Sequence, residues 1–317
     1  MVFLLFLASL LGLAYMFPPQ DEPVSRVGLP AVAHRPLPPE LGPQATAQLL
    51  RTRLEHLASQ YPGNYGVVVS DPSSHKTVAL NADQRFLAAS LAKLPVLFTL
   101  YRAAALGEVN LEDEISMLSS DVQAYGTGAL YTHRVGYTMT LRRCARFMIK
   151  ESDNTAWVML ERYLGRENIE AELFEIGANS TDYSSPTTTT PGDVLLMLKA
   201  IADPSYTSPA LSAEMLDLMT NTSFEDRLPQ PLPEGARVAH KIGSYEDTFS
   251  DAGIVFPEGS HGTKEAYFIV VMAEDTTEQT ARSAIQDMSL ATYTLVGEPA
   301  WKAIQHAPTE PRAPAAT

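Results

Sequence analysis

Strand-like segments occupy both ends of the central part of this chain, and a long stretch with helical spacing separates them. Short apolar or alternating runs bounded by turn residues predict strands. Five segments have this character: 65–70, 76–80, 237–242, 250–256 and 266–273. The residues between about 90 and 220 show the apolar spacing of helices instead. Strands so far apart in the sequence can share one sheet only if the chain folds back on itself.

This order of elements predicts an α+β fold. We expect an antiparallel sheet built from both chain ends, with flanking helices over residues 44–60 and about 277–296. We also expect an all-helical subdomain over about 90–220. Helices packed against a sheet form one layered core. The cleft between the sheet and the helical subdomain is the expected place for an active site.

The two ends of the chain differ in composition from this domain, which we place at 44–300. Residues 1–17 are apolar and would span ~25 Å as a helix, close to the thickness of a bilayer core. They predict a membrane anchor or a cleaved signal segment. The protein is then exported: membrane-anchored and facing the extracytoplasmic side, or periplasmic or secreted if the segment is cleaved. Residues 18–43 predict a Pro-rich linker and residues 301–317 a disordered tail.

Composition excludes several classes of protein. The formal net charge is −14, whereas a nucleic-acid binder needs clustered Lys and Arg, so we expect no nucleic-acid partner. The single cysteine, Cys144, excludes a disulfide framework, and its helical surroundings favour a buried thiol. The seven histidines are scattered, and none has the spacing of paired helix-borne ligands. We therefore expect no metal and no cofactor.

The first of three short motifs with residues for nucleophilic catalysis is Ser90-Leu-Ala-Lys93, at the start of an apolar helix. Positions three apart share one face of a helix, so Lys93 can reach the Ser90 hydroxyl. A desolvated amine can take the proton of that hydroxyl. The alternative is that Ser90 only caps the helix, and the same pattern recurs at Ser73–Lys76, in a predicted turn.

The second motif is Ser152-Asp153-Asn154, which lies between two helical runs. A second hydroxyl can relay a proton to a leaving group, and an amide can orient a substrate carbonyl. Asp153 is expected to brace the turn. The alternative is that all three residues form only a capping turn.

The third motif is Lys241-Ile242-Gly243, followed by Ser244, on a predicted strand. A lysine at this place can line a cleft, and a glycine lets a ligand approach the backbone closely. The free N–H groups of an edge strand can pair with a substrate peptide. The alternative is a solvated lysine that protects a sheet edge from aggregation.

In this order, the three motifs resemble the set found in class A β-lactamase-like serine hydrolases, a superfamily that includes the penicillin-binding proteins. The resemblance covers residues 44–300. It extends to the segment 187–193, which is similar to the Thr-rich helix start after the family's omega loop. The spacing within the segment agrees with this, because Thr190 can cap a helix whose first residue is Pro191.

The resemblance implies a role for each matching residue. Ser90 would be the acylated nucleophile, Lys93 its base, and Ser152 the proton shuttle to the leaving nitrogen. Lys241 would stabilise the site electrostatically and help to hold a substrate carboxylate. The backbone N–H groups of Ser90 and Ser244 would form the oxyanion hole. The residues expected to bind substrate are Asn154, Gly243, Ser244 and, at the mouth of the cleft, Tyr125.

Two departures from the family pattern affect the expected chemistry. Ile242 replaces the usual threonine, so a hydroxyl contact to a substrate carboxylate is lost unless Ser244 supplies it. The segment 165–190 also lacks the Glu-x-x-Leu-Asn pattern whose glutamate activates the deacylating water. Glu161 lies in the nearest similar string, but inside the helix that follows Asn154. The other nearby glutamates are expected to be solvated on helix faces: Glu151, Glu167, Glu170, Glu172 and Glu175.

The sequence therefore predicts a serine hydrolase that forms an acyl-enzyme on Ser90 with β-lactams or related amides and deacylates slowly. One alternative is a penicillin-binding or D-alanyl-D-alanine peptidase-type enzyme that acts on cell-wall peptides. Another is a non-catalytic scaffold of the same fold. The expected partner is a small-molecule β-lactam or a cell-wall peptide, with membrane attachment through residues 1–17.

Overall fold

The computed structural model describes residues 42–259 and 266–297. The predicted membrane segment (1–17), the linker up to residue 41 and the tail (301–317) lie outside the described residues. The predicted helix at 44–60 is present and begins one residue earlier, because Pro43 occupies its first turn.

Five strands form one sheet in the order β2-β1-β9-β8-β7, and every neighbouring pair is antiparallel. The strands are β1 (Asn64–Asp71), β2 (Lys76–Leu80), β7 (Arg237–Tyr245), β8 (Thr248–Phe256) and β9 (Tyr267–Glu274). β1, from the beginning of the domain, pairs with β9, from its end, so that Val67 lies opposite Val271. The predicted α+β fold with a sheet built from both chain ends is confirmed.

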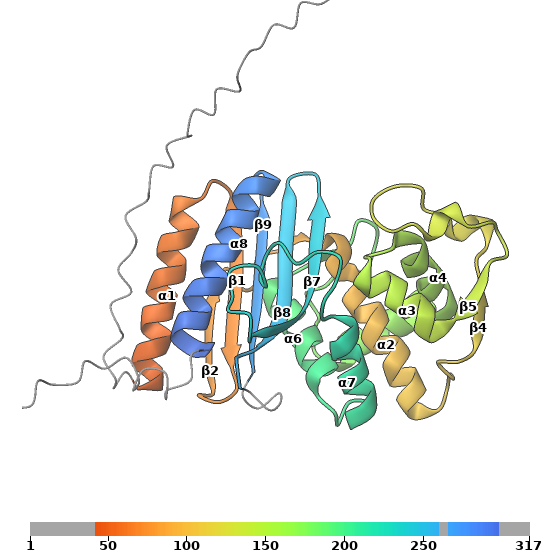
Figure 1. Cartoon of the computed structure of the whole chain (residues 1–317), viewed down its shortest axis with the longest axis horizontal. Helices are drawn as coiled ribbons and strands as arrows, with labels where there is room; N and C mark the ends of the chain where they lie inside the picture. Colours follow the sequence, from red (N-terminus) through yellow and green to blue (C-terminus); the bar gives the residue numbers. More distant parts are fainter. Residues whose placement is uncertain (1–41, 260–265, 298–317) are drawn as a thin grey trace, which may run out of the picture. The chain divides into compact units, whose positions relative to one another are not determined.

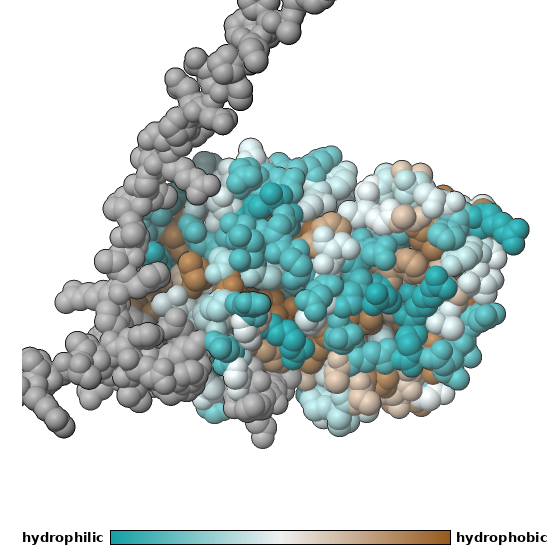
Figure 2. Space-filling view, viewed as in Figure 1, coloured by the Kyte–Doolittle hydropathy of each residue, from teal (hydrophilic) through white to brown (hydrophobic). Residues whose placement is uncertain are grey.

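Two helices from opposite ends of the domain cover one face of this sheet. They are α1 (Pro43–Gln60) and α8 (Glu278–Thr292), which lie side by side in Figure 1. Leu54 of α1 and Ile285 of α8 are fully buried in one hydrophobic core with the sheet. A π-helical turn, Tyr293–Gly297, follows α8. The face of the domain seen in Figure 2 is mainly hydrophilic, as expected for helices that turn their apolar sides inward.

The region between the two groups of strands is mainly helical and forms a second core. Its helices are α2 (Lys93–Leu106), α3 (Leu141–Lys150), α4 (Asn154–Leu164), α5 (Arg166–Glu175), α6 (Pro191–Ala202) and α7 (Pro209–Leu218), with 3₁₀ turns η1 (Ala89–Ala92), η2 (Ser119–Asp121) and η3 (Leu130–Thr132). α6 packs against the second face of the sheet, and α2, α3 and α4 lie beyond β7 (Figure 1). Every side chain from Leu94 to Tyr101 in α2 is buried. α2 is therefore the central helix of this second core.

Two short ribbons that the sequence analysis did not predict interrupt the helical region. β3 (Phe86–Leu87) pairs with β6 (Thr188–Thr189), and β4 (Glu114–Ser116) pairs with β5 (Thr138–Thr140). The first ribbon ties the segment before Ser90 to the segment before α6.

One helical segment among the described residues, Ala89–Leu106, is long and apolar enough to cross a membrane. Its most apolar window is 67% buried inside the domain. The apolar composition of this segment thus matches its place as the central core helix.

Candidate active site

The first motif is fixed at the junction of β3 and α2. The Ala88 N–H donates a hydrogen bond of 3.0 Å to the Thr187 carbonyl, which continues the β3–β6 ribbon toward Ser90. Ser90 lies in η1, and Lys93 is the first residue of α2. Lys93 is fully buried, and its Nζ lies 2.8 Å from Ser90 Oγ. The predicted contact between the serine and the lysine is present.

Lys93 Nζ has four oxygen neighbours. It lies 2.7 Å from the Ser152 carbonyl oxygen and 2.7 Å from Asn154 Oδ1, and both of these atoms can only accept hydrogen bonds. The other two neighbours are hydroxyls, Ser90 Oγ at 2.8 Å and Ser152 Oγ at 3.1 Å. A neutral amine would use its two N–H groups on the two acceptors and leave its lone pair for a hydroxyl proton.

The surroundings of Lys93 also favour the neutral amine. Burial, and after it the positive charge of Lys241, lower the pKa of Lys93 well below its usual value, and the charge of Asp153 opposes this only in part. The Trp157 ring, with its centroid 5.5 Å from Nζ, completes the enclosure. Lys93 is therefore poised to act as a base.

The second motif lies in the turn between α3 and α4. Ser152 has a positive φ of 53°, which presents both its carbonyl and its hydroxyl to Lys93. Asp153 caps α4 by accepting a hydrogen bond from the Ala156 N–H, and its other oxygen accepts one from the Leu130 N–H. Asp153 thus braces the turn, as predicted from the sequence.

A glycine-containing loop, 125–128, packs directly against this turn. Thr127 Oγ1 donates a hydrogen bond of 2.7 Å to the Ser152 carbonyl, and Asn154 Nδ2 donates one of 3.1 Å to the Tyr125 carbonyl. A Cβ on Gly128 would lie 2.1 Å from an oxygen of Asp153, so only glycine fits there. The sequence analysis singled out Tyr125 of this loop but missed its glycines, for which the repeated Gly at 126 and 128 was an available signal.

The third motif lies on β7, the edge strand of the sheet. Lys241 is buried, and its Nζ lies 2.9 Å from Ser152 Oγ, so this hydroxyl is shared between Lys93 and Lys241. Burial lowers the pKa of Lys241 to about 7; the charge of Asp251 opposes this shift and that of Arg227 adds to it. A Cβ on Gly243 would lie 2.9 Å from the Ala88 carbonyl. The close approach that this glycine permits is thus to the segment before Ser90, in the same chain.

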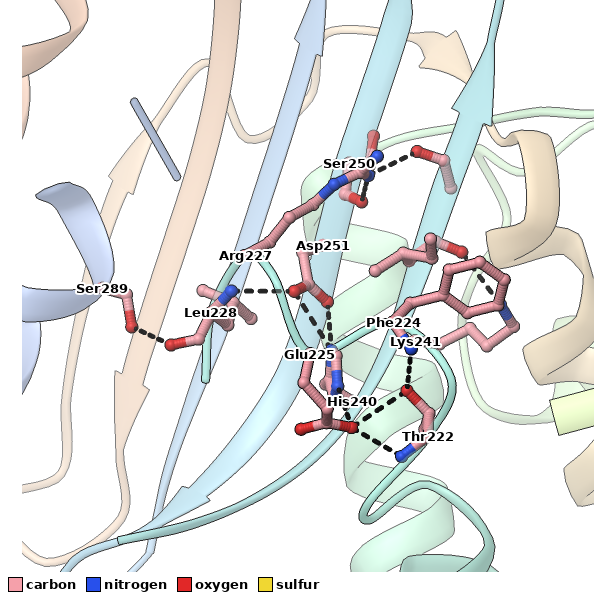
Figure 3. A network of polar contacts seen from close by, with 12 residues as sticks. Thr222, Phe224, Glu225, Arg227, Leu228, His240, Lys241, Ser250, Asp251 and Ser289 are labelled. Carbon is pink, nitrogen blue, oxygen red and sulfur yellow. Dashed lines mark hydrogen bonds and ion pairs between the residues drawn. The ribbon is translucent and has the colours of Figure 1, made fainter. Parts of the chain in front are cut away.

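Behind β7 lies a buried polar network that the sequence analysis missed (Figure 3). Asp251 of β8 is fully buried; it lies 2.8 Å from His240 Nδ1 and accepts a hydrogen bond from the Leu228 N–H. Burial alone would lower the pKa of His240, but the charge of Asp251 and hydrogen bonds to Asp251 and Glu225 raise it to about 9. This network fixes the loop 222–228 on the back of β7.

Arg227 of the same loop reaches the Ser244 end of β7. Its guanidinium donates hydrogen bonds to the Gly243 carbonyl (2.9 Å), the Ser250 carbonyl (2.6 Å) and Ser244 Oγ (2.5 Å). Only 2% of Arg227 is exposed. A buried arginine gives no periodic signal in a sequence, so pattern alone could not identify this cation beside Ser244.

A cleft of about 620 Å³ opens above these groups. Of the residues predicted from the sequence, four line it: Ser90, Tyr125, Asn154 and Ser244. Lys93, Ser152 and Lys241 are buried and contact Ser90 or each other from within the fold. Tyr125 and Tyr245, 69% and 55% exposed, are exposed aromatic residues of the lining.

Within 42–259 and 266–297, no group of three or more His, Cys, Asp or Glu side chains is arranged to hold a metal ion. Cys144 is buried, and burial raises the pKa of its thiol. The polar side chains of the three motifs around Ser90 are the amines of Lys93 and Lys241, the hydroxyl of Ser152 and the amide of Asn154.

The fold and this cluster define the class of molecule: an α+β domain with the serine hydrolase fold of the β-lactamases, in which a buried lysine contacts the serine at the start of a core helix. The chain belongs to the β-lactamase enzyme family, whose family model matches residues 49–296.

Curated relatives are β-lactamases. The chain is 26% identical over 222 residues to β-lactamase 3 of Bacillus cereus, a match that covers 63% of this chain and 67% of that protein. It is 30% identical over 162 residues to a β-lactamase of Amycolatopsis lactamdurans, which covers 48% of this chain and 52% of that protein.

Solved structures show the same fold. PBP-A has a TM-score of 0.72 and 26% sequence identity, over 77% of this chain and 94% of that chain. A class A β-lactamase from Bacteroides cellulosilyticus also has a TM-score of 0.72, over 80% of this chain and 98% of that one; at 20% identity this match shows the fold alone.

Proposed function

We propose that this protein is a serine hydrolase of the class A β-lactamase type that forms an acyl-enzyme on Ser90 with β-lactams or related amides. The observation that carries the proposal is the surroundings of Lys93: two acceptors for its N–H groups, and the Ser90 hydroxyl 2.8 Å from its nitrogen. A base within hydrogen-bond reach activates a serine hydroxyl, which is otherwise a weak nucleophile. A mutant of PBP-A, another structure with 26% identity, is an acyl-enzyme complex with penicillin G.

The short distances give acylation a complete proton path. Ser90 Oγ bonds to the carbonyl carbon of the substrate, and its proton passes to Lys93 Nζ. When the carbon–nitrogen bond breaks, the nitrogen keeps the electron pair and takes the proton of Ser152 Oγ. Lys93, 3.1 Å from Ser152 Oγ, then returns a proton to that oxygen. Two hydroxyls and one amine thus carry one proton from the nucleophile to the leaving group.

The remaining groups would bind the substrate. Arg227 contacts Ser244, which lines the cleft, and Lys241 lies three residues earlier on the same strand, so a substrate carboxylate would lie at this end. Ser244 is held by Arg227 and supplies the hydroxyl that Ile242 lacks. We place the oxyanion hole at the N–H groups of Ser90 and Ser244, where preorganised donors would stabilise the developing negative charge.

Slow deacylation is part of the proposal. Hydrolysis of the ester on Ser90 needs a base next to a water molecule. Within 42–259 and 266–297, the carboxylate that lines the cleft is that of Glu161. It lies two helical turns beyond Asn154, or ~10 Å along α4 at ~1.5 Å per residue, and it is paired with Arg166 at 2.7 Å. This position supports a stable acyl-enzyme.

Intact-mass spectrometry after brief exposure to benzylpenicillin tests both parts. We expect the mass to increase by one penicillin, and the adduct to persist for many minutes. Ser90→Ala should give no adduct, whereas Ser73→Ala, which changes the chance copy of the motif, should acylate normally. Rapid turnover without an adduct would contradict slow deacylation, and an adduct in Ser90→Ala would contradict the assigned nucleophile.

A second candidate function is a penicillin-binding or D-alanyl-D-alanine peptidase-type enzyme that acts on cell-wall peptides. The observation that favours it is the place of Glu161, which lies two helical turns beyond Asn154 and is paired with Arg166, since peptide transfer does not require fast hydrolysis of a β-lactam ester. Release of D-alanine from a peptide that ends in D-alanyl-D-alanine separates the two candidates: sustained release supports the peptidase-type enzyme, and acylation by benzylpenicillin without such release supports the β-lactamase-type enzyme.

We further propose that the protein is exported, with residues 1–17 as a membrane anchor or a cleaved signal segment. The support is the apolar composition of these residues and the extracytoplasmic location of the proposed substrates. Cell fractionation with an antibody against the domain tests this proposal. Recovery of the full-length chain from the cytoplasm would contradict it.

A further inference from the structure

The cleft is longer than the reactive centre alone requires. Its wall runs along one face of α4 to the residue that follows the helix, and it consists of Asn154, Trp157, Val158, Glu161, Arg162 and Gly165. Positions three and four apart form one helix face. Since this face begins at Asn154, next to Lys93, an acyl group on Ser90 has ~10 Å of cleft along the two turns to Glu161.

The middle of this extension is aromatic. Trp157 and Tyr183 both line the cleft, and Trp157 Nε1 donates a hydrogen bond of 3.2 Å to Tyr183 Oη. This bond ties the loop 183–187 to α4 across the floor of the cleft. Tyr183 is 3% exposed and Trp157 is half-buried, so the Trp157 ring is the one that can bind the methylene part of a substrate chain by burying its apolar surface.

The far end carries two opposite charges, Glu161 and Arg166, which are 2.7 Å apart with side chains 19% and 44% exposed. Arg166 also contacts the Tyr183 carbonyl. The neighbouring Arg162 is already paired with both oxygens of Asp121, at 2.8 and 2.9 Å. A partly exposed ion pair contributes little to stability. A ligand with both charges can therefore bind Glu161 and Arg166 together.

We propose, resting on the acyl-enzyme function above, that this end of the cleft is a subsite for acyl side chains that end in an α-amino acid group. The ammonium would contact Glu161 and the carboxylate Arg166. An α-aminoadipyl side chain has about eight bonds from the acylated carbonyl carbon to the ammonium nitrogen, and at ~1.2 Å per bond it spans ~10 Å. This length matches the path along α4.

The test compares three penicillins with the full-length protein: one with a D-α-aminoadipyl side chain, one with an adipyl side chain that lacks the ammonium, and benzylpenicillin. Intact-mass spectrometry gives the second-order rate constant of acylation for each. We expect the aminoadipyl compound to acylate Ser90 roughly tenfold faster than the adipyl compound, the effect of one charge-assisted contact. In Glu161→Gln, the rate constant for the aminoadipyl compound should fall by that roughly tenfold factor. The rate constants for the adipyl compound and benzylpenicillin should change less than about twofold.

Glu167→Gln is the matched control, because Glu167 is exposed on the next helix and lies outside the cleft lining. It should change none of the three rate constants. Equal rates for the aminoadipyl and adipyl compounds would overturn the subsite. An equal loss for all three compounds in Glu161→Gln would also overturn it, since it would show that the ion pair only supports the loop. If benzylpenicillin also fails to acylate the unmodified protein, the proposed function itself is wrong.

Discussion

Two residues next to the reactive groups have left-handed backbone conformations, which cost energy for any side chain other than glycine. Ala89, directly before Ser90, has a φ of 46°, and Ser152 has a φ of 53°. Each such conformation costs on the order of 1 kcal/mol. At Ser152 the surroundings hold it in place, because its carbonyl accepts hydrogen bonds from Lys93 and Thr127. The strained backbone positions thus lie at or next to the two serines whose hydroxyls the proposed reaction uses.

The charge of Lys241 gives acylation a predicted pH dependence. Its pKa is about 7, so the side chain is charged below pH 7 and becomes neutral above it. Because the charged form attracts a substrate carboxylate, the acylation rate constant for benzylpenicillin should fall as the pH rises from 7 to 9. In Lys241→Arg the charge persists over this range, so the absolute rate will be lower but the fall should disappear. If the acylation rate constant depended on pH in the same way in both proteins, Lys241 would not be the group that controls the fall between pH 7 and 9.

The pKa of His240 is shifted in the opposite direction to that of Lys241, and this shift makes a prediction about stability. Its pKa is raised from 6.5 to about 9 in the folded protein, so its contribution is complete below pH 6.5 and is lost as the pH rises through 9. The shift corresponds to at most about 3 kcal/mol. Urea unfolding of the unmodified protein and of His240→Asn should therefore differ most at pH 6 and least at pH 10. A difference that stays constant with pH would contradict a charged His240–Asp251 pair.

At the scale of elements, the loop 125–128 fixes the second motif by close packing against it. Gly128 has a φ of 92°, and a Cβ there would lie 2.1 Å from a carboxylate oxygen of Asp153. This carboxylate caps α4 through the Ala156 N–H. A displaced Asp153 would therefore move the start of α4 and, with it, Asn154.

Gly128→Ala should accordingly lower both stability and acylation. The matched control is Gly136→Ala, because Gly136 has a similar φ of 87° with no atom within 4 Å of an added Cβ. In the control, the backbone conformation should lower the free energy of unfolding by about 1 kcal/mol. Gly128→Ala should lower the free energy of unfolding by at least about 2 kcal/mol more. It should also lose most of the acylation rate. Urea unfolding and benzylpenicillin labelling measure the two effects. Equal losses in both variants would mean that the contact with Asp153 is unimportant.

The elements themselves were predictable because their signals are local. The apolar run of β1 and the capped, periodic pattern of α8 are each complete within a short window of sequence. β3 and β6 are only two residues long and exist because Phe86 lies opposite Thr189. A pairing of that kind depends on the packing of distant segments, so no local pattern could predict it.

The same distinction applies to the site. Ser90 and Lys93 lie on one turn, so helical geometry alone predicted their contact. Their contact with Ser152 was inferred from the order of three motifs, since no local rule joins residues 90 and 152. Arg227 and Asp251 could not be found in this way, because burial of an isolated charge depends on partners that only the folded sheet supplies.

At the scale of the whole molecule, the sheet joins the two ends of the domain. β1 is second in the strand order and bonds to β9 on one side and β2 on the other. β7, which carries Lys241, reaches β1 only through β8 and β9. Folding must therefore close a loop of roughly 200 residues before Lys241 can lie beside Ser152. The entropy cost of this closure is large, but it grows only slowly with the length of the loop.

This closure predicts which parts of the chain the site requires. The two described cores, the sheet and the cleft are formed by residues within 42–297. A chain that begins at Gly42 should therefore melt at the same temperature as the full-length protein and acylate with benzylpenicillin at the same rate, within about twofold. A chain that ends at Gly235, before β7, should not fold, because it would leave β1 without β9 and α6 without β8 and β9, against which it packs. Circular dichroism and penicillin labelling check both variants. A cooperative unfolding transition in the chain that ends at Gly235, or loss of folding in the chain that begins at Gly42, would show that the domain is not held together by the joining of its two ends.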